Sequence, residues 1–134
     1  MNFAIELHDS ELASIVKTAD LARIPLRPAY IHKSAGVPGL DPGTGWIQDI
    51  DLVIRGASIE GDVDKYPATI TDGMLRIDRK QFDNCLPLPL NRVANVTLRL
   101  ELMWLRGTIT VRGSSISACL VTEPKYVEEF SGSL

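Results

Sequence analysis

The sequence predicts an all-β protein: a single antiparallel β-sandwich or flattened barrel of about eight to ten short strands, with at most one short helix. The first reason is that apolar and polar residues alternate with a period of two along much of the chain, as half-buried strands require. The second is that glycine- and proline-containing turn signals separate the alternating segments, while heptads and internal repeats are absent from the sequence.

The length and composition predict one β domain spanning residues 1–134. A chain of 134 residues with 45% hydrophobic residues can fill one core. The two cysteines form no C-x-x-C pattern and the N-terminal residues do not read as a leader peptide, so we expect a cytoplasmic protein with free thiols. The net charge of −3 argues against nucleic-acid binding. No apolar stretch approaches the roughly 20 residues of a membrane-spanning helix, so we expect no membrane partner either.

At the N-terminus, residues 3–8 alternate as a strand, with Phe3, Ile5 and Leu7 on one face. Residues 10–19 fit two structures. Their apolar residues have helical spacing, with a capping residue in front, but the segment also fits a strand that turns back at Ala19 and Asp20. The β-branched residues and the surrounding strands favour the strand, and the helix stays open as the alternative.

A longer hairpin is predicted from residues 23–34 and 46–56, joined by the glycine- and proline-rich loop 35–45. Folding the two segments together places their apolar positions on a common face. The expected pairs are Leu26 with Ile54, Tyr30 with Ile50, and His32 with Gln48.

Proline and glycine refine this picture. Pro25 and Pro28 cannot donate ladder hydrogen bonds, so we expect strand 23–34 at a sheet edge. The apolar phase slips at Gly56, which indicates a β-bulge or bend there. Residues 86–90 are too rich in proline for a central strand and are expected as an edge strand or loop.

The second half predicts a hairpin and a meander. Residues 68–71 and 74–77 flank Asp72 and Gly73, a two-residue turn signal. Three further strands are expected with turns near Gly107 and Gly113. The residues expected to point inward on these three strands are Leu98, Leu100, Leu102, Ile109, Val111, Ile116 and Leu120.

A candidate ligand-binding site lies at the base of loop 35–45, because such long loops between strands often carry function. Aromatic and polar side chains gather there in the expected hairpin, a composition typical of recognition patches. The alternative is that these residues simply end the core. The candidate residues are Tyr30, His32, Trp46, Gln48 and Asp49.

Catalytic and metal sites are not expected. His8, Asp9 and Ser10 include the residue types of a hydrolase triad, but neighbours on a strand point to opposite faces and cannot converge. The two histidines, His8 and His32, could bind metal with Asp9, Glu11 or Cys85 only if the fold brought them together, since zinc-site spacings are missing. We therefore expect no enzyme activity, no cofactor and no metal.

The residues Leu7 to Leu12, followed by Ile15, form a hydrophobic–His-Asp-Ser–acid–Leu signature, and the C-terminal segment contains Lys125–Phe130. Both segments resemble those of small bacterial proteins related to the immunity proteins of polymorphic toxin systems. The resemblance implies an all-β cytoplasmic domain that binds a toxin.

The function predicted from the sequence is therefore non-catalytic, immunity-like protein binding. The alternative is a small-ligand or carbohydrate-binding β domain whose site lies beside loop 35–45. We also expect a homodimer, because a free sheet edge at strand 23–34 or at residues 86–90 invites pairing with a second copy.

Overall fold

The computed structural model describes residues 1–63 and 65–131, and these form an almost entirely antiparallel β structure. The all-β prediction is confirmed, and the described residues include one short helical segment, the 3-10 turn η1 (Met103–Leu105). Among these residues, no helix has the length and apolar character needed to cross a membrane. The strands are β1 (Asn2–Glu6), β2 (Glu11–Leu12), β3 (Val16–Thr18), β4 (Leu21–Ser34), β5 (Gly43–Arg55), β6 (Ser58–Glu60), β7 (Ala68–Ile77), β8 (Lys80–Asp83), β9 (Cys85–Leu88), β10 (Asn91–Leu102), β11 (Gly107–Leu120) and β12 (Lys125–Phe130).

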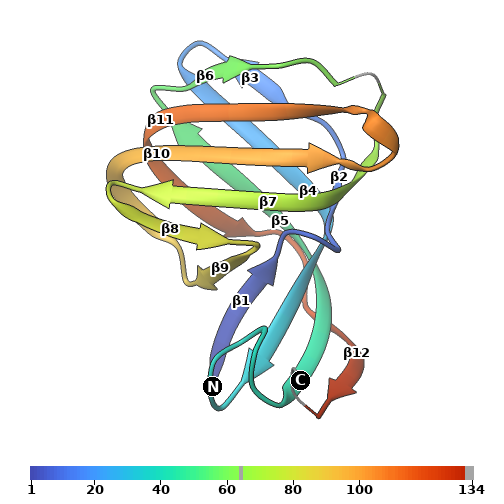
Figure 1. The fold of residues 1–134 in the computed structure, drawn as a ribbon. Helices are drawn as coiled ribbons and strands as arrows, with labels where there is room; N and C mark the ends of the chain where they lie inside the picture. The colour runs from blue at the N-terminus through green and yellow to red at the C-terminus, as the bar shows by residue number, and fades with distance from the viewer. Residues whose placement is uncertain (64, 132–134) are drawn as a thin grey trace.

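Six strands close into an antiparallel barrel in the order β5-β11-β10-β7-β2-β4, and the pairing of β4 with β5 completes the ring. The outer strands pair onto this ring: β3 onto β4, β6 onto β11 and β8 onto β7. Figure 1 shows the barrel as the upper part of the molecule. Closure leaves these six strands few free edges, which is how all-β folds avoid uncontrolled pairing.

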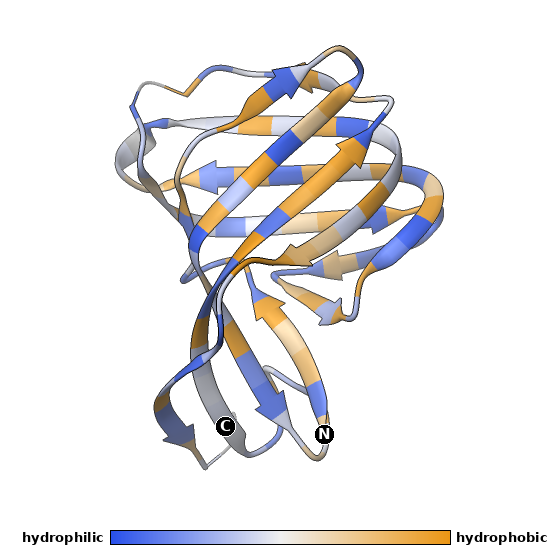
Figure 2. Cartoon of the chain, turned by 180° about the vertical axis from the view of Figure 1, so that it is seen from behind, coloured by the Kyte–Doolittle hydropathy of each residue, from blue (hydrophilic) through white to orange (hydrophobic). Residues whose placement is uncertain are grey.

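The barrel interior is filled by the alternating apolar residues that the sequence identified. Along the strands, hydrophobic and hydrophilic residues follow one another (Figure 2). Six of the seven residues expected to point inward are buried; Leu120 is the exception, with 61% of its surface exposed. This prediction was wrong because β10 pairs with β11 only as far as Ser117, so the end of β11 has no neighbour on that side of the ladder. The confirmed inward residues are Leu98, Leu100, Leu102, Ile109, Val111 and Ile116.

Below the barrel, β4 and β5 continue into an open sheet that we call the arm. The arm consists of β1, residues 29–34 of β4, residues 43–48 of β5, β12 and the connecting loop 35–42. Figure 1 shows it projecting from the barrel, with the N-terminus and the end of β12 at its far end. Because the arm does not close on itself, each of its two faces is exposed unless other side chains pack against it.

The long hairpin is confirmed, but its expected register and edge position were wrong. Strand β4 pairs with β5 on one side and with β1, β2 and β3 on the other, so it is not an edge. A β-bulge between Leu26 and Ala29 shifts the register, because Pro28 cannot continue the ladder of hydrogen bonds. The observed pairs are Leu26 with Ile50, Tyr30 with Ile47, and His32 with Gly45.

Two glycines predicted in turns lie inside strands. Gly73 belongs to β7, and a side chain there would come within 2.6 Å of Leu7 Cδ1. Gly113 belongs to β11, where a side chain would collide with Ile54 and the Arg55 carbonyl. Glycine is needed at both positions for close approach and not for a turn. The predicted three-stranded meander is therefore the single hairpin β10–β11.

Three other local predictions are confirmed. Residues 10–19 contain the short strands β2 and β3 and a turn at Ala19, which has a φ of 51°. Gly56, with a φ of 62°, bends the chain after β5. Strand β9, rich in proline, pairs with β1 as the last strand of the sheet.

Candidate functional site

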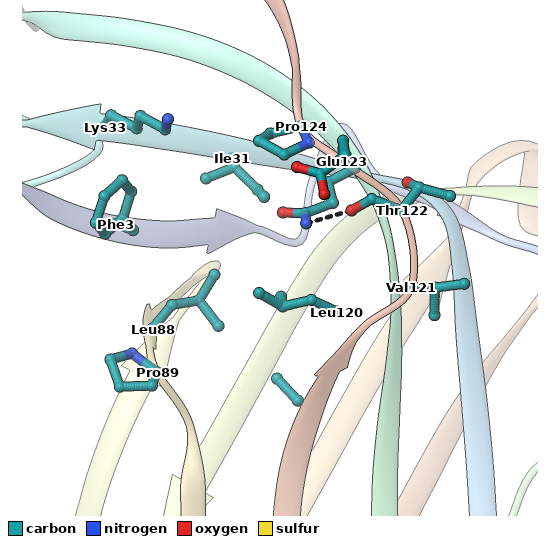
Figure 3. Close-up of a pocket in the computed structure, with 12 residues that line it drawn as sticks. Phe3, Ile31, Lys33, Leu88, Pro89, Leu120, Val121, Thr122, Glu123 and Pro124 are labelled. Carbon is teal, nitrogen blue, oxygen red and sulfur yellow. Dashed lines mark hydrogen bonds between the residues drawn. The ribbon is translucent and has the colours of Figure 1, made fainter.

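A groove of about 930 Å³ lies where the arm meets the barrel (Figure 3). One face of the arm supplies its floor, with side chains from β1, β4 and β5. One wall is the end of β9 and the following Pro89, and the other is the end of β11 with the connector to β12. The lining residues are Phe3, Ile31, Lys33, Gln48, Leu88, Pro89, Ala118, Leu120, Val121, Thr122, Glu123 and Pro124.

Large apolar side chains are exposed together in this groove. Phe3 has 36% of its surface exposed, Leu120 61% and Val121 50%. They are uncovered because the groove lies beyond the closed barrel, and within residues 1–63 and 65–131 no further strand is layered on this face of the arm. Soluble proteins seldom leave apolar side chains exposed in one contiguous patch unless something binds there.

The connector that forms the second wall is held by hydrogen bonds from β5. Gln48 Nε2 donates to the Thr122 carbonyl oxygen at 2.5 Å. The Asp49 N–H donates to the Thr122 hydroxyl at 3.0 Å, and the Asp49 carbonyl accepts from the Val121 N–H at 2.8 Å. These bonds place the exposed Val121 and its neighbours at a defined position beside the groove.

Lys33 brings a positive charge to the groove. Its ammonium lies 3.8 Å from the centroid of the Trp46 ring and 5.2 Å from that of Phe3. No carboxylate comes within 4.0 Å of it among the residues that the structure describes. Lys33 is therefore held by aromatic rings and keeps its charge free for an anionic group.

The opposite face of the arm carries polar side chains, of which His32 is buried, Tyr30 half-buried and Glu128 exposed. The Tyr30 hydroxyl donates to Glu128 at 3.0 Å. His32, 4% exposed, accepts a hydrogen bond from the Gly39 N–H at Nδ1 and packs edge-on against Phe130, with ring centroids 4.7 Å apart. Its Nε2 is buried without a partner in the described part of the chain. His32 thus anchors loop 35–42 to the sheet.

This polar face is also acidic. Burial raises the pKa of Tyr30 far above its usual range, and the hydrogen bond to Glu128 and the charges of Glu128, Glu6 and Asp9 raise it further. Burial, and then the charge of Glu6, raise the pKa of the Cys85 thiol. Both groups therefore stay protonated at neutral pH.

The candidate residues from the sequence do not converge. We expected His32 and Gln48 on the same side of the sheet, and this was wrong: Tyr30 and His32 lie on the polar face, whereas Trp46 and Gln48 lie on the groove face. The bulge in β4 adds one residue and so reverses which residues share a face. Asp49 acts through its backbone on the connector. A ligand-binding role for the five residues stays a prediction.

Most of the groove was not predicted from the sequence. Phe3 and Leu120 were assigned to alternating strands, and Leu88 to a proline-rich edge strand or loop. Nothing in these patterns says that an apolar residue at the end of a strand lies outside the barrel. The available signal was the break in alternation after Leu120, where Val121 follows directly and Pro124 then prevents continuation of the strand.

A small group of metal-ligating side chains lies beside the polar face. His8 Nε2 is 3.9 Å from Glu6 Oε2 and 3.8 Å from Asp9 Oδ2, and these three groups could hold a cation. Ser10, in contrast, is fully buried: its hydroxyl donates to the Glu6 carbonyl at 2.8 Å and accepts from the Tyr30 N–H at 2.9 Å. The Ser10 hydroxyl therefore holds β1 and β4 together. The absence of metal and of catalysis stays a prediction.

Comparison with known proteins finds no match to this chain among family models, curated proteins or solved structures.

Proposed function

We propose that the protein is a non-catalytic binding module that holds an apolar segment of a protein partner in the groove between arm and barrel. The observation that carries the proposal is the joint exposure of Phe3, Leu120 and Val121 in one groove. Burying them against a partner would remove apolar surface from water, the main favourable contribution in most protein associations.

The chemistry of the groove suits a polypeptide. Its lining is mainly aliphatic, and Lys33, Glu123 and Gln48 add two opposite charges and one amide. A protein segment supplies apolar side chains and charged groups at fixed spacings, and an apolar centre with a polar rim is the usual anatomy of protein interfaces. The carbohydrate alternative has less support, because the ammonium of Lys33 covers the face of Trp46 on which a sugar would stack.

The N-terminal resemblance to immunity-related proteins is less direct evidence for the identity of the partner than the groove is. Of the residues that carry it, Leu7, Ser10 and Leu12 are completely buried, and none of them lines the groove. These buried residues support the fold. The residues that line the groove are therefore expected to determine which partner binds. A toxin as that partner is part of this proposal.

The test begins with capture of binding proteins on immobilised wild-type protein and on two variants. Leu120→Asp places a charge in the groove, and Val93→Asp places the same charge at a position that is 90% exposed and outside the groove. Each protein captured is then purified, and its affinity for the wild type and both variants is measured by calorimetry.

We expect a partner whose affinity falls about tenfold or more with Leu120→Asp and is unchanged by Val93→Asp, since a buried charge removes the contribution of an apolar contact. Equal affinities for all three proteins would contradict the proposal. A small molecule that co-purifies with the wild type in native mass spectrometry, and is lost in Leu120→Asp, would support the ligand-binding alternative.

A further inference from the structure

The groove carries opposite charges at separate positions of its lining. Lys33 comes from the arm, and Glu123 comes from the connector between β11 and β12; Figure 3 shows them apart, with Ile31 between. Glu123 is exposed, and neither residue has an ion-pair partner within 4.0 Å among the residues described. Each charge is therefore available to a molecule that covers the groove.

A second copy of the same chain is complementary to this pattern. In a two-fold dimer every contact occurs twice, so a contact from Lys33 to the partner's Glu123 implies the same contact in reverse. The exposed Phe3, Leu120 and Val121 of each copy would then be covered by the facing copy. Charge favours an arrangement with Lys33 opposite the partner's Glu123. It disfavours one in which the two Lys33 residues, or the two Glu123 residues, face each other.

The edges of the sheet favour a face-to-face dimer over pairing of strands. The terminal strand β9 contains Pro87 and is followed by Pro89, neither of which can donate to an added strand. The other terminal strand, β12, is interrupted by a β-bulge between Tyr126 and Glu128 and carries three charged residues. Bulges and charges are the means by which natural proteins block edge pairing. Of the two free edges expected from the sequence, the one at β4 does not exist and the one at β9 is a true edge that its prolines block, so the groove face takes their place as the reason for a dimer.

We propose that a second copy of this chain covers the groove face in a two-fold dimer, with Lys33 of each copy paired to the partner's Glu123. The inference rests on the groove being the interaction surface of the proposed function. A protein partner in that groove displaces the second copy, so the dimer is the resting form of the binding module.

Sedimentation velocity over about a hundredfold range of protein concentration tests the dimer. We expect the wild type to shift from monomer to dimer, and Lys33→Glu or Glu123→Lys alone to weaken the dimer about tenfold or more, because like charges then face each other. The double charge swap, Lys33→Glu with Glu123→Lys, restores opposite charges and should recover dimerisation. Val93→Asp serves as the control that leaves the dimer intact.

Lys33→Gln keeps a long side chain over Trp46 and separates loss of charge from loss of folding. It should fold as the wild type does, by circular dichroism, and dimerise more weakly. A wild type that stays monomeric at every concentration, or a double swap that is no better than the single variants, would overturn the inference.

The two proposals fail separately. A monomeric wild type whose captured partner still depends on Leu120 leaves the proposed function standing and removes the dimer. A dimer that responds to the charge swap, with captured proteins indifferent to Leu120→Asp, removes the heterologous partner and keeps the dimer.

Discussion

The barrel and the arm share β4 and β5, yet they bury their residues in different ways. In the barrel, Ile24 and Leu26 of β4 face a closed interior and are completely buried. In the arm, the same strand has two faces, one with the buried His32 and the other along the groove with Lys33. A closed barrel leaves no apolar face uncovered, whereas an open sheet of the same strands leaves one free for a partner.

The two regions are also stabilised differently. The barrel depends on the burial of a core cluster of apolar side chains. The arm depends in part on polar contacts, such as those of His32 with Gly39 and of Tyr30 with Glu128. We therefore expect substitutions in the barrel to change global stability most and those in the arm to act locally.

The largest effect is expected in the barrel. Leu100→Ala removes a completely buried side chain and should lower the free energy of unfolding by about 2–5 kcal/mol. Its neighbour Arg99 lies outside the barrel in an exposed ion pair with Glu101 at 3.0 Å, so Arg99→Ala should cost no more than about 0.5 kcal/mol. Denaturant unfolding measures both values. The reverse ranking would mean that the register of β10 is wrong by one residue.

A smaller and local effect is expected in the arm. His32→Ala removes the acceptor of the Gly39 N–H and the edge-on contact with Phe130, and each loss costs about 0.5–1.5 kcal/mol. Hydrogen exchange should become faster in loop 35–42 while the amides of β10 are unchanged. His32→Asn is the matched control, because its side-chain oxygen can accept in place of Nδ1. Equal acceleration in β10 would show that arm and barrel unfold as one unit.

At the junction of the two regions, Asp51 pairs with Arg23 at 3.1 Å and with Arg27 at 2.7 Å. Both arginines are partly exposed, so Asp51→Asn should cost only about 1 kcal/mol, and less at high salt. Thermal unfolding at low and high ionic strength measures this difference. Glu60→Gln, in a more exposed pair with Arg112, is the comparison and should have a smaller effect. A loss for Asp51→Asn that salt does not reduce would contradict an electrostatic cause.

The smallest effect is expected at Tyr30, and it appears only at high pH. The pKa of Tyr30 is raised above its usual value of 10.0 in the folded protein, so the folded state keeps a proton that the unfolded state loses. Stability should therefore fall as pH rises above about 10. Tyr30→Phe should flatten this fall and change stability at pH 7 by no more than about 0.5 kcal/mol.

Urea unfolding at pH 7 and above pH 10 measures the change. Part of the pH dependence should remain in Tyr30→Phe, because burial also raises the pKa of Tyr66. A Tyr30→Phe variant with the full pH dependence of the wild type would exclude Tyr30 as a source of it.

The sequence by itself determined the class of the fold and much of the barrel core. Alternation identified Leu98, Leu100 and Val111 as inward residues, because the two-residue period of a strand leaves only one face for the core. Proline content placed β9 at an edge and Gly56 marked a bend, since both depend on local backbone chemistry.

Only the tertiary structure determined three features: where strands continue through a glycine, where the pairing register shifts, and which sheet faces remain exposed. Gly73 and Gly113 serve close packing against Leu7 and Ile54, which no local pattern distinguishes from a turn. The bulge before Ala29 depends on how β4 pairs with β5, and it moved His32 and Gln48 to opposite faces. The groove exists because the barrel closes without covering the arm. Periodicity is a local property of a strand, whereas register and closure depend on the neighbours with which that strand pairs.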